Sequence, residues 1–315
     1  MFDVTHRFIK TNGISLHVAE SGDGPLVLLL HGWPELWYSW RRQLRALAEA
    51  GYHAVAPDLR GYGQSEMPIS QEAYSMRTLL ADIEGLLDAL GERDAVLVGH
   101  DWGATTAWNV AALRPDRCRA VVGMSVPYLG RSPVPPTKLF EQLFGERWFY
   151  VSYFQEPGAA ETEFEADVER TMRIILAGTA PFDTTAPALL AKRKGEGFFA
   201  GIEVPSTLPA WLSGEDLAYF VKQYEASGFR GGLARYRNMD RDWEELPELA
   251  TAKIEQPALF ITGERDPSRS LAPTYAMRVF VPNLQEVVVP EGGHWIQQEQ
   301  PEAVNTALLR FLRER

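Results

Sequence analysis

The sequence has little of what several large classes of protein need. It contains one cysteine, Cys118, so no disulfide can form within the chain. No apolar run is long enough to cross a membrane, and the N-terminus lacks the basic and apolar regions of a signal peptide. The net charge of −11 and the lack of a basic cluster disfavour nucleic acid as a partner. We therefore expect a soluble protein of the reducing cytoplasm that binds neither membrane nor nucleic acid.

Signatures of metals and cofactors are also missing. The six histidines do not fall at the spacing of metal ligands. Gly61 and Gly63 match part of a phosphate-binding loop, but the third glycine is absent and a turn after Pro57 explains them better. We assign no metal and no cofactor, and the sequence leaves open whether the protein is a monomer or a homodimer.

The order of apolar segments predicts an α/β fold. Short apolar or β-branched runs alternate with amphipathic helices, which is typical of a mostly parallel sheet with helices on both faces. The dipeptide Asn12-Gly13 favours a tight hairpin, so the first two strands are expected to be antiparallel. The predicted strands are residues 7–10, 14–18, 25–30, 52–56, 95–98, 120–124, 257–262 and 286–289, and the predicted core helices are residues 40–50, 79–90, 102–113 and 272–280, with a last helix from Pro301.

The alternation stops in the middle of the chain. Between residues 126 and 249 proline and aromatic residues are frequent, helical stretches such as Val168 to Ala177 occur, and no segment has the pattern of a buried strand. We interpret this part as a helical lid inserted into a single α/β core. The predicted core consists of residues 1–128 and 247–315, and the predicted lid of residues 129–246.

One junction between a strand and a helix carries the clearest chemical signal. Gly99 and Gly103 stand two residues to either side of Asp101, where they leave room for a very sharp turn of the backbone. This is the pattern of a nucleophile elbow with aspartate in place of the usual serine. A carboxylate is already ionised at neutral pH, so it attacks without losing a proton and forms an ester. By itself, the stretch also fits a helix with Asp101 as an ordinary N-cap.

Two further residues complete a candidate triad. Asp266 and His294 each follow a predicted strand, and the carboxyl ends of parallel strands meet at one edge of a sheet. The order nucleophile, acid, histidine is the one expected of a triad built around such an elbow. His294 would take a proton from water, and Asp266 would orient the imidazole ring. The activated water would then cleave the ester of Asp101.

Cleavage of an ester passes through an oxyanion, which needs hydrogen-bond donors. The backbone N–H of Trp102 lies at the start of a helix, where the helix dipole favours negative charge. The backbone N–H of Trp33, in the loop after an early strand, is the expected second donor. Pro34 directly follows Trp33 and is a candidate for a cis peptide bond.

These residues resemble the soluble epoxide hydrolases of the α/β-hydrolase fold. The resemblance covers essentially the whole chain and implies an α/β-hydrolase core with a helical cap. It also implies hydrolysis of epoxides to vicinal diols through an aspartyl ester. The motifs that carry it are His31-Gly32-Trp33-Pro34-Glu35, Gly99-His100-Asp101-Trp102-Gly103, Gly293-His294-Trp295, Tyr153-Phe154-Gln155-Glu156-Pro157-Gly158 and Tyr236-Arg237-Asn238-Met239-Asp240-Arg241-Asp242-Trp243.

The resemblance assigns a role to two lid tyrosines. In the family, tyrosines at the positions of Tyr153 and Tyr236 donate hydrogen bonds to the epoxide oxygen. The chemistry requires such donors, because ring opening produces an alkoxide that a neutral phenol can stabilise. Without the resemblance, both side chains would be interpreted as packing residues of a helical lid.

The expected partners are water and an apolar epoxide that carries aryl or alkyl groups. This expectation rests on the aromatic residues predicted around the site. The predicted pocket is lined by Trp33, Pro34, Trp37, Trp102, Phe154 and Trp295.

Two other functions stay open on the sequence alone. Haloalkane and haloacid dehalogenases of the same fold also use an aspartate nucleophile, but a halide leaves without a proton and needs N–H donors rather than two phenols. Trp102 could be one such donor, whereas haloalkane dehalogenases typically have asparagine at the position of Trp33. A non-catalytic small-molecule receptor can retain the fold, yet it has no need of a complete triad. Asp101 excludes a serine-type esterase.

Overall fold

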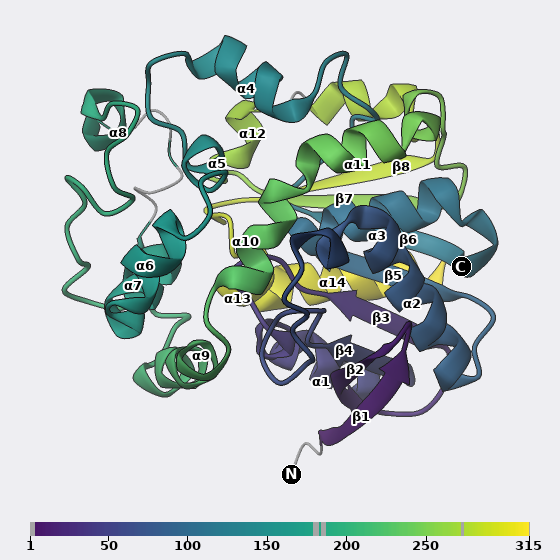
Figure 1. Cartoon of the computed structure of the whole chain (residues 1–315). Helices are drawn as coiled ribbons and strands as arrows, with labels where there is room; N and C mark the ends of the chain where they lie inside the picture. The colour runs from purple at the N-terminus through teal and green to yellow at the C-terminus, as the bar shows by residue number, and fades with distance from the viewer. Residues whose placement is uncertain (1–3, 179–182, 184–186, 272–273, 315) are drawn as a thin grey trace.

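The computed structural model, which describes residues 4–178, 183, 187–271 and 274–314, is built around an eight-stranded sheet (Figure 1). The strand order is β1-β2-β4-β3-β5-β6-β7-β8. β2 pairs antiparallel with both β1 and β4, and all other neighbours are parallel. The strands are β1 (Thr5–Thr11), β2 (Ile14–Ser21), β3 (Leu26–Leu30), β4 (His53–Pro57), β5 (Ala95–His100), β6 (Cys118–Met124), β7 (Ala258–Gly263) and β8 (Leu284–Val289).

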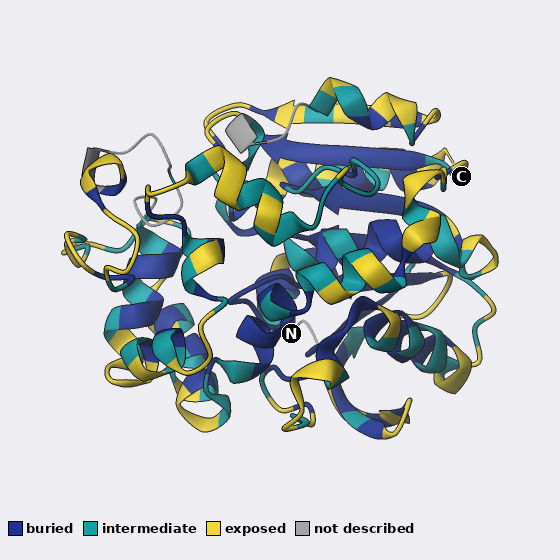
Figure 2. Ribbon diagram, turned by 45° about the horizontal axis from the view of Figure 1, so that its top comes forward, coloured by how far each residue is buried: buried dark blue, intermediate teal, exposed yellow. Residues whose placement is uncertain are grey.

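The sequence pattern explains both the hairpin and the buried centre of the sheet. Asn12 and Gly13 have φ angles of 43° and 77°, as a tight hairpin turn requires. Side chains along a strand alternate between faces, so Leu28 of β3 packs into one hydrophobic cluster and Leu29 into another. Both faces of β3 and β5 are therefore buried, and Figure 2 shows the central strands in dark blue.

Helices cover the two faces of the sheet. One face packs against α1 (Arg41–Glu49), α13 (Ile296–Glu299) and α14 (Pro301–Arg313), and the other against α2 (Met76–Leu90) and α3 (Trp102–Leu113). The predicted α/β-hydrolase fold class is confirmed. Shorter core elements are α12 (Ser268–Leu271) and the 3₁₀ helices η1 (Trp37–Trp40), η2 (Gln71–Tyr74), η3 (Pro115–Arg117), η4 (Pro247–Ala250) and η5 (Thr274–Val279).

The helix expected over residues 272–280 differs from the structure. Residues 272 and 273 lie outside the described residues, and the rest of the segment forms the 3₁₀ helix η5 rather than an α-helix.

The lid is helical and lies between β6 and β7 in the sequence. In the described part of this insertion, no strand joins the main sheet. Figure 1 shows the lid helices in teal and green, beside and above the sheet. Among the described residues, no helix combines the length and the apolar character that crossing a bilayer requires. The lid helices are α4 (Pro136–Phe144), α5 (Tyr150–Tyr153), α6 (Ala159–Glu165), α7 (Val168–Ala177), α8 (Pro187–Ala191), α9 (Gly214–Ser227), α10 (Arg230–Arg237) and α11 (Met239–Glu245).

Candidate active site

Asp101 stands at the sharp turn between β5 and α3. Its φ and ψ angles are 53° and −121°, a conformation that costs free energy for any residue with a Cβ atom. A Cβ atom on Gly99 would collide with the carbonyl group of Gly103, and one on Gly103 would collide with that of Leu30. The two glycines are therefore what permits the turn, and the turn holds the Asp101 carboxylate out at the end of the sheet.

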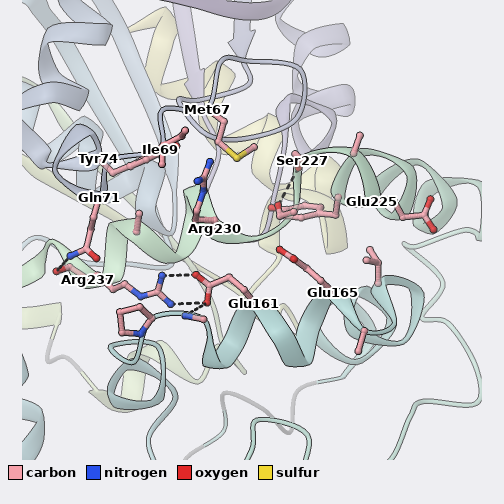
Figure 3. Close-up of a pocket in the computed structure, with 18 of the residues that line it drawn as sticks. Met67, Ile69, Gln71, Tyr74, Glu161, Glu165, Glu225, Ser227, Arg230 and Arg237 are labelled. Atoms are coloured by element: carbon pink, nitrogen blue, oxygen red, sulfur yellow. Dashed lines mark hydrogen bonds and ion pairs between the residues drawn. The ribbon is translucent and has the colours of Figure 1, made fainter.

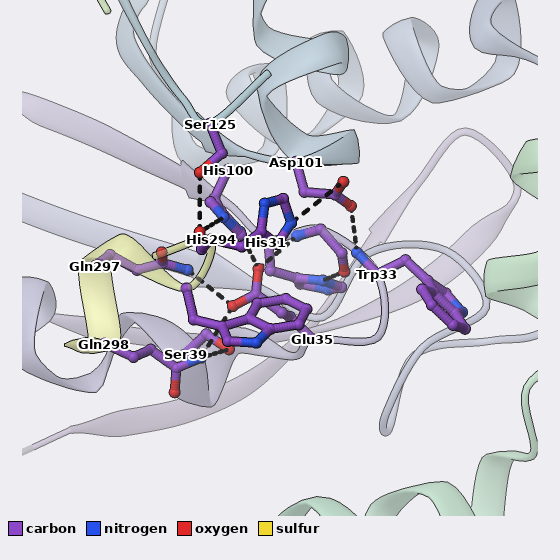
Figure 4. A network of polar contacts seen from close by, with 12 residues as sticks. His31, Trp33, Glu35, Ser39, His100, Asp101, Ser125, His294, Gln297 and Gln298 are labelled. Carbon is purple, nitrogen blue, oxygen red and sulfur yellow. Dashed lines mark hydrogen bonds and ion pairs between the residues drawn. The ribbon is translucent and has the colours of Figure 1, made fainter. Parts of the chain in front are cut away.

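The structure brings the three predicted triad residues together at the ends of β5, β7 and β8. His294 Nδ1 lies 3.1 Å from Asp266 Oδ1, within hydrogen-bond distance. His294 Nε2 lies 3.9 Å from Asp101 Oδ2, which is longer than a hydrogen bond. The backbone N–H of Trp33 donates to Asp101 Oδ1 over 2.8 Å (Figure 4), and Trp102 is the first residue of α3.

The charges around His294 favour its protonated form in the free protein. Burial alone would lower the pKa of His294, but Asp266 and, to a smaller extent, Asp101 and Glu35 outweigh burial and raise it to about 9. Burial would raise the pKa of Asp266, yet its interaction with His294 dominates and holds that pKa below the ordinary value. In the resting site, His294 is therefore an imidazolium between two carboxylates at neutral pH.

Two cavities border Asp101 at the junction of core and lid. The smaller, of about 70 Å³, is lined by Trp33, Tyr150, Tyr236, His294 and Trp295, among others. The larger, of about 410 Å³, extends from Asp101 and Trp102 between α3 and the lid helices α4 and α11, and most of its wall is apolar. A reacting molecule in the smaller cavity would contact the nucleophile and the histidine at once.

Two lid tyrosines, Tyr150 and Tyr236, line both cavities. Their ring centroids are 6.2 Å apart, and the Tyr236 ring packs edge-on against Trp102 at 5.1 Å. Burial, followed by the charge of Asp101, raises the pKa of each phenol well above its ordinary value. Both hydroxyls are thus protonated and able to donate hydrogen bonds to an oxygen beside Asp101.

The expectation that Tyr153 points into the site is wrong. Tyr153 lines neither cavity, and its hydroxyl donates to Glu163 Oε2 over 2.6 Å. Tyr150 and Tyr153 are the first and last residues of the single-turn helix α5, so the sequence offers two tyrosines for one place. The signal that separates them is Glu163 on α6, whose half-buried carboxylate needs a donor from within the lid.

Comparisons with known proteins agree on one family. Residues 25–301 match the family model described as alpha/beta hydrolase fold. The sequence is 47% identical to epoxide hydrolase A of Mycobacterium tuberculosis over 98% of this chain and 97% of that protein, and 41% identical to epoxide hydrolase 2 of Siraitia grosvenorii over 100% of both. The crystal structure of epoxide hydrolase A from Mycobacterium thermoresistibile superposes with a TM-score of 0.94 at 44% identity, covering 99% of this chain and 98% of that one. The chain belongs to the epoxide hydrolases of the α/β-hydrolase superfamily.

The remaining residues of the predicted pocket divide into two groups in this epoxide hydrolase. Trp33, Trp102 and Trp295 line one of the two cavities, whereas Pro34, Trp37 and Phe154 line neither. The peptide bond between Trp33 and Pro34 is cis.

Trp37 and Phe154 pack behind the site. The indole N–H of Trp37 donates to the hydroxyl of Tyr219 over 2.7 Å. Phe154 is fully buried, with its ring 5.1 Å from that of Trp33 and 5.0 Å from that of Tyr236. Phe154 was placed in the pocket wrongly, because the aromatic cluster of the lid encloses its ring and the sequence does not show which face of the cluster is open.

Sequence reasoning assigned no role to a buried polar network beneath the epoxide hydrolase site. His100 Nδ1 lies 2.6 Å from Glu35 Oε2, and His100 Nε2 lies 2.7 Å from the backbone carbonyl oxygen of His294 (Figure 4). Glu35 also accepts from the backbone N–H of Gly32, next to the donor Trp33. One buried carboxylate thus connects the loop of the oxyanion donors to the loop of the histidine.

The network keeps Glu35 ionised although the side chain is fully buried. Burial would raise the pKa of Glu35, but His100 and further hydrogen bonds hold it at about 2. Gln297 and Gln298 donate to the other carboxylate oxygen over 2.8 and 3.1 Å. The signal in the sequence was the position of two polar residues: Glu35 lies in the same motif as Trp33, and His100 directly precedes Asp101.

Proposed function

We propose that the protein hydrolyses apolar epoxides to vicinal diols through a covalent ester of Asp101. The observation that carries this proposal is the smaller cavity, in which the Asp101 carboxylate and His294 face the hydroxyl-bearing rings of Tyr150 and Tyr236. A carboxylate nucleophile and two neutral phenols suit an epoxide, because its oxygen becomes an alkoxide when the ring opens.

In the first half-reaction, Asp101 Oδ2 attacks a carbon of the epoxide. A bond forms between that oxygen and the carbon, and the carbon–oxygen bond of the ring breaks with its electron pair passing to the epoxide oxygen. The hydroxyls of Tyr150 and Tyr236 stabilise the charge on this oxygen. Asp101 Oδ1 stays on the backbone N–H of Trp33, which orients Oδ2 for the attack.

Ester formation prepares His294 for the second half-reaction. It neutralises Asp101, and the charge of Asp101 is one of the causes that raise the pKa of His294. The imidazolium therefore releases its proton more readily once the ester is present, and that proton neutralises the alkoxide, which becomes a hydroxyl group. The charge on Asp101 thus couples the two half-reactions.

In the second half-reaction, His294 takes a proton from water and the resulting hydroxide attacks the ester carbonyl carbon of Asp101. The negative charge moves to the carbonyl oxygen, where the N–H groups of Trp33 and Trp102 receive it. The bond between Cγ and Oδ2 of Asp101 then breaks, and Oδ2 leaves on the product and takes the proton from His294. The carboxylic acid left on Asp101, which carries the oxygen from water, gives its proton to His294. The diol is released, and the carboxylate and the imidazolium of the resting site are restored.

The larger cavity indicates the class of epoxide. Its volume of about 410 Å³ and its largely apolar wall suit an epoxide with a sizeable aryl or alkyl group. Tyr150 and Tyr236 border both cavities, so the reacting carbon would sit in the smaller one while the apolar group extends into the larger.

A trapping experiment tests the proposal. His294→Gln removes the base of the second half-reaction, so the ester should accumulate. After incubation with styrene oxide, intact-protein mass spectrometry should show a gain of one whole epoxide, and peptide mapping should locate it on Asp101. The same variant with 1-bromohexane serves as the matched control. A gain of the alkyl group without bromide, and no gain from the epoxide, would replace the proposal with a dehalogenase.

A further inference from the structure

Arg235 places a buried positive charge beside the candidate nucleophile. The residue lies on α10 and is 1% exposed. Its Nη2 donates to Thr106 Oγ1 over 2.8 Å and approaches the backbone carbonyl oxygen of Trp102 at 3.5 Å. Its Nη1 has no hydrogen-bond partner among the described residues. Both described contacts of the guanidinium are thus to neutral oxygens.

A charge in such surroundings is costly. Burying a cation without a carboxylate partner is unfavourable because it loses its hydration, and folded proteins usually avoid it. Burial lowers the pKa of Arg235, but the guanidinium stays protonated at neutral pH because its ordinary pKa is above 12. A residue that destabilises the fold in this way is a candidate for a functional role.

The charged and titratable groups that face Arg235 come from five segments. They are His31 in the loop after β3, Tyr62 in the loop after β4, Asp242 on α11, Asp101 at the elbow and Tyr236 on α10 itself. Asp242 has another partner, since its Oδ1 accepts from the backbone N–H of Met76 over 2.6 Å. Burial raises the pKa of Asp242 to about 7, although this hydrogen bond and the charge of Arg235 oppose the shift. Of the groups that face Arg235, Asp101 is the one whose charge changes during the proposed reaction.

The position of Arg235 determines which step its charge affects. Thr106 and Trp102 belong to the first turns of α3, the helix that begins directly after Asp101. The guanidinium carbon lies 5.2 Å from the centroid of the Trp102 ring. The cation thus lies at the N-terminal end of α3, where the helix dipole also favours negative charge on Asp101.

We propose that Arg235 is a positioning residue that speeds hydrolysis of the Asp101 ester through its charge. This inference rests on the proposed epoxide hydrolase function. In ester hydrolysis, negative charge forms on Asp101 and positive charge forms on His294. A fixed cation stabilises the first, and by repulsion it keeps more of His294 in the ester intermediate in the neutral form that accepts a proton from water. In ring opening, negative charge leaves Asp101, so the same cation gives no help.

Arg237 provides a matched control two residues further along α10. It is half-buried, and its guanidinium pairs with Glu161 on α6 (Figure 3). The hydrogen bond from its Nη2 to Glu161 Oε2 measures 2.9 Å. Arg237 is thus a paired cation with a structural role, whereas Arg235 forms no ion pair with a carboxylate of the described part of the chain.

The test measures the two half-reactions separately by rapid quench and intact-protein mass spectrometry with styrene oxide. Arg235→Gln should slow ester hydrolysis at least tenfold, change ester formation less than threefold, and move the pH midpoint of hydrolysis upward. Arg235→Lys should restore most of the rate. Arg237→Gln should lower the thermal unfolding midpoint and leave both rates and the pH midpoint unchanged. Arg235→Met, which is also uncharged, gives the same comparison if Arg235→Gln folds poorly.

The outcomes distinguish this inference from the function on which it rests. Equal slowing of both half-reactions by Arg235→Gln would overturn the role of Arg235 alone. Failure of Arg235→Lys to restore the rate of ester hydrolysis would do the same. If the wild-type protein and Arg235→Gln both form no ester with the epoxide, the proposed function and the role of Arg235 fail together.

Discussion

The core and the lid contribute to the active site in different ways. The core supplies Asp101, Asp266 and His294 from the ends of neighbouring parallel strands, where backbone pairing sets their positions. The lid supplies Tyr150 from a single-turn helix and Tyr236 from a helix of two turns, and both are held by contacts between aromatic rings. The first arrangement depends on the register of the sheet, and the second on how side chains pack.

The core and the lid also act in different half-reactions. In the proposed mechanism, the lid tyrosines act when the epoxide ring opens, and the core residues Asp266 and His294 act when the ester is cleaved. Asp101 takes part in both. Variants of the core and of the lid should therefore slow different half-reactions.

Replacement of Asp101 should have the largest effect. Asp101→Ala removes the atom that forms the ester, so diol formation should fall by about 10⁴-fold or more. Chromatographic assay of the diol checks this, with the thermal unfolding midpoint as the control for folding. Residual turnover within tenfold of the wild type would show that the epoxide is opened without a covalent intermediate.

Asp266→Asn should slow only the core half-reaction. Without the Asp266 charge the pKa of His294 falls and the imidazole is less well oriented, so ester hydrolysis should slow by about 10² to 10⁴-fold. The ester should still form and should accumulate to a nearly full equivalent in the mass spectrum. Slow ester formation with no accumulation would contradict the division of labour between core and lid.

Asp266→Asn should also change how the free energy of unfolding depends on pH. His294 has a pKa of about 9 in the folded protein and an ordinary value near 6.5 when unfolded, so the folded state binds the extra proton between these values. Its contribution to the free energy of unfolding is fully present below about pH 6.5 and is lost as the pH rises through about 9. Urea titrations across this range should show the decline in the wild type and a flatter dependence in Asp266→Asn.

Tyr150→Phe should slow only the lid half-reaction. Loss of one hydrogen bond to the developing alkoxide should reduce the rate of ester formation by about 10²-fold. Ester hydrolysis should change less than threefold, because the proposed mechanism gives Tyr150 no part in activating the water. Rapid-quench measurements of both rates test the prediction. Equal slowing of the two would show that core and lid do not act in separate half-reactions.

Tyr153→Phe should have the smallest effect on activity. Its hydroxyl donates to Glu163, which also accepts from the backbone N–H groups of Phe198 and Phe199. The variant should lose about 1 kcal/mol of unfolding free energy and change both half-reactions less than threefold. If it slows ring opening as much as Tyr150→Phe does, the two tyrosines have been assigned the wrong way round.

Most of the fold and the core half of the site followed from local patterns in the chain. Alternating strands and helices indicated the parallel sheet, and Gly99 and Gly103 indicated the elbow at Asp101. Asp266 and His294 were found because residues directly after parallel strands converge at one edge of the sheet. This convergence requires only the order of the elements, which the sequence contains.

The tertiary structure decided the rest, because the spacing of residues along one helix does not show which distant segment each side chain packs against. Tyr150 and Tyr153 occupy one helical turn, and only their contacts with other segments show that Tyr150 lies beside Asp101 whereas Tyr153 donates to Glu163. The same holds for Arg235 and Arg237, two arginines that flank one tyrosine. Glu161 pairs with one of them, whereas the other is buried against α3 beside the nucleophile. Local chemistry therefore determined the nucleophile, and contacts between segments distant in the chain determined its surroundings.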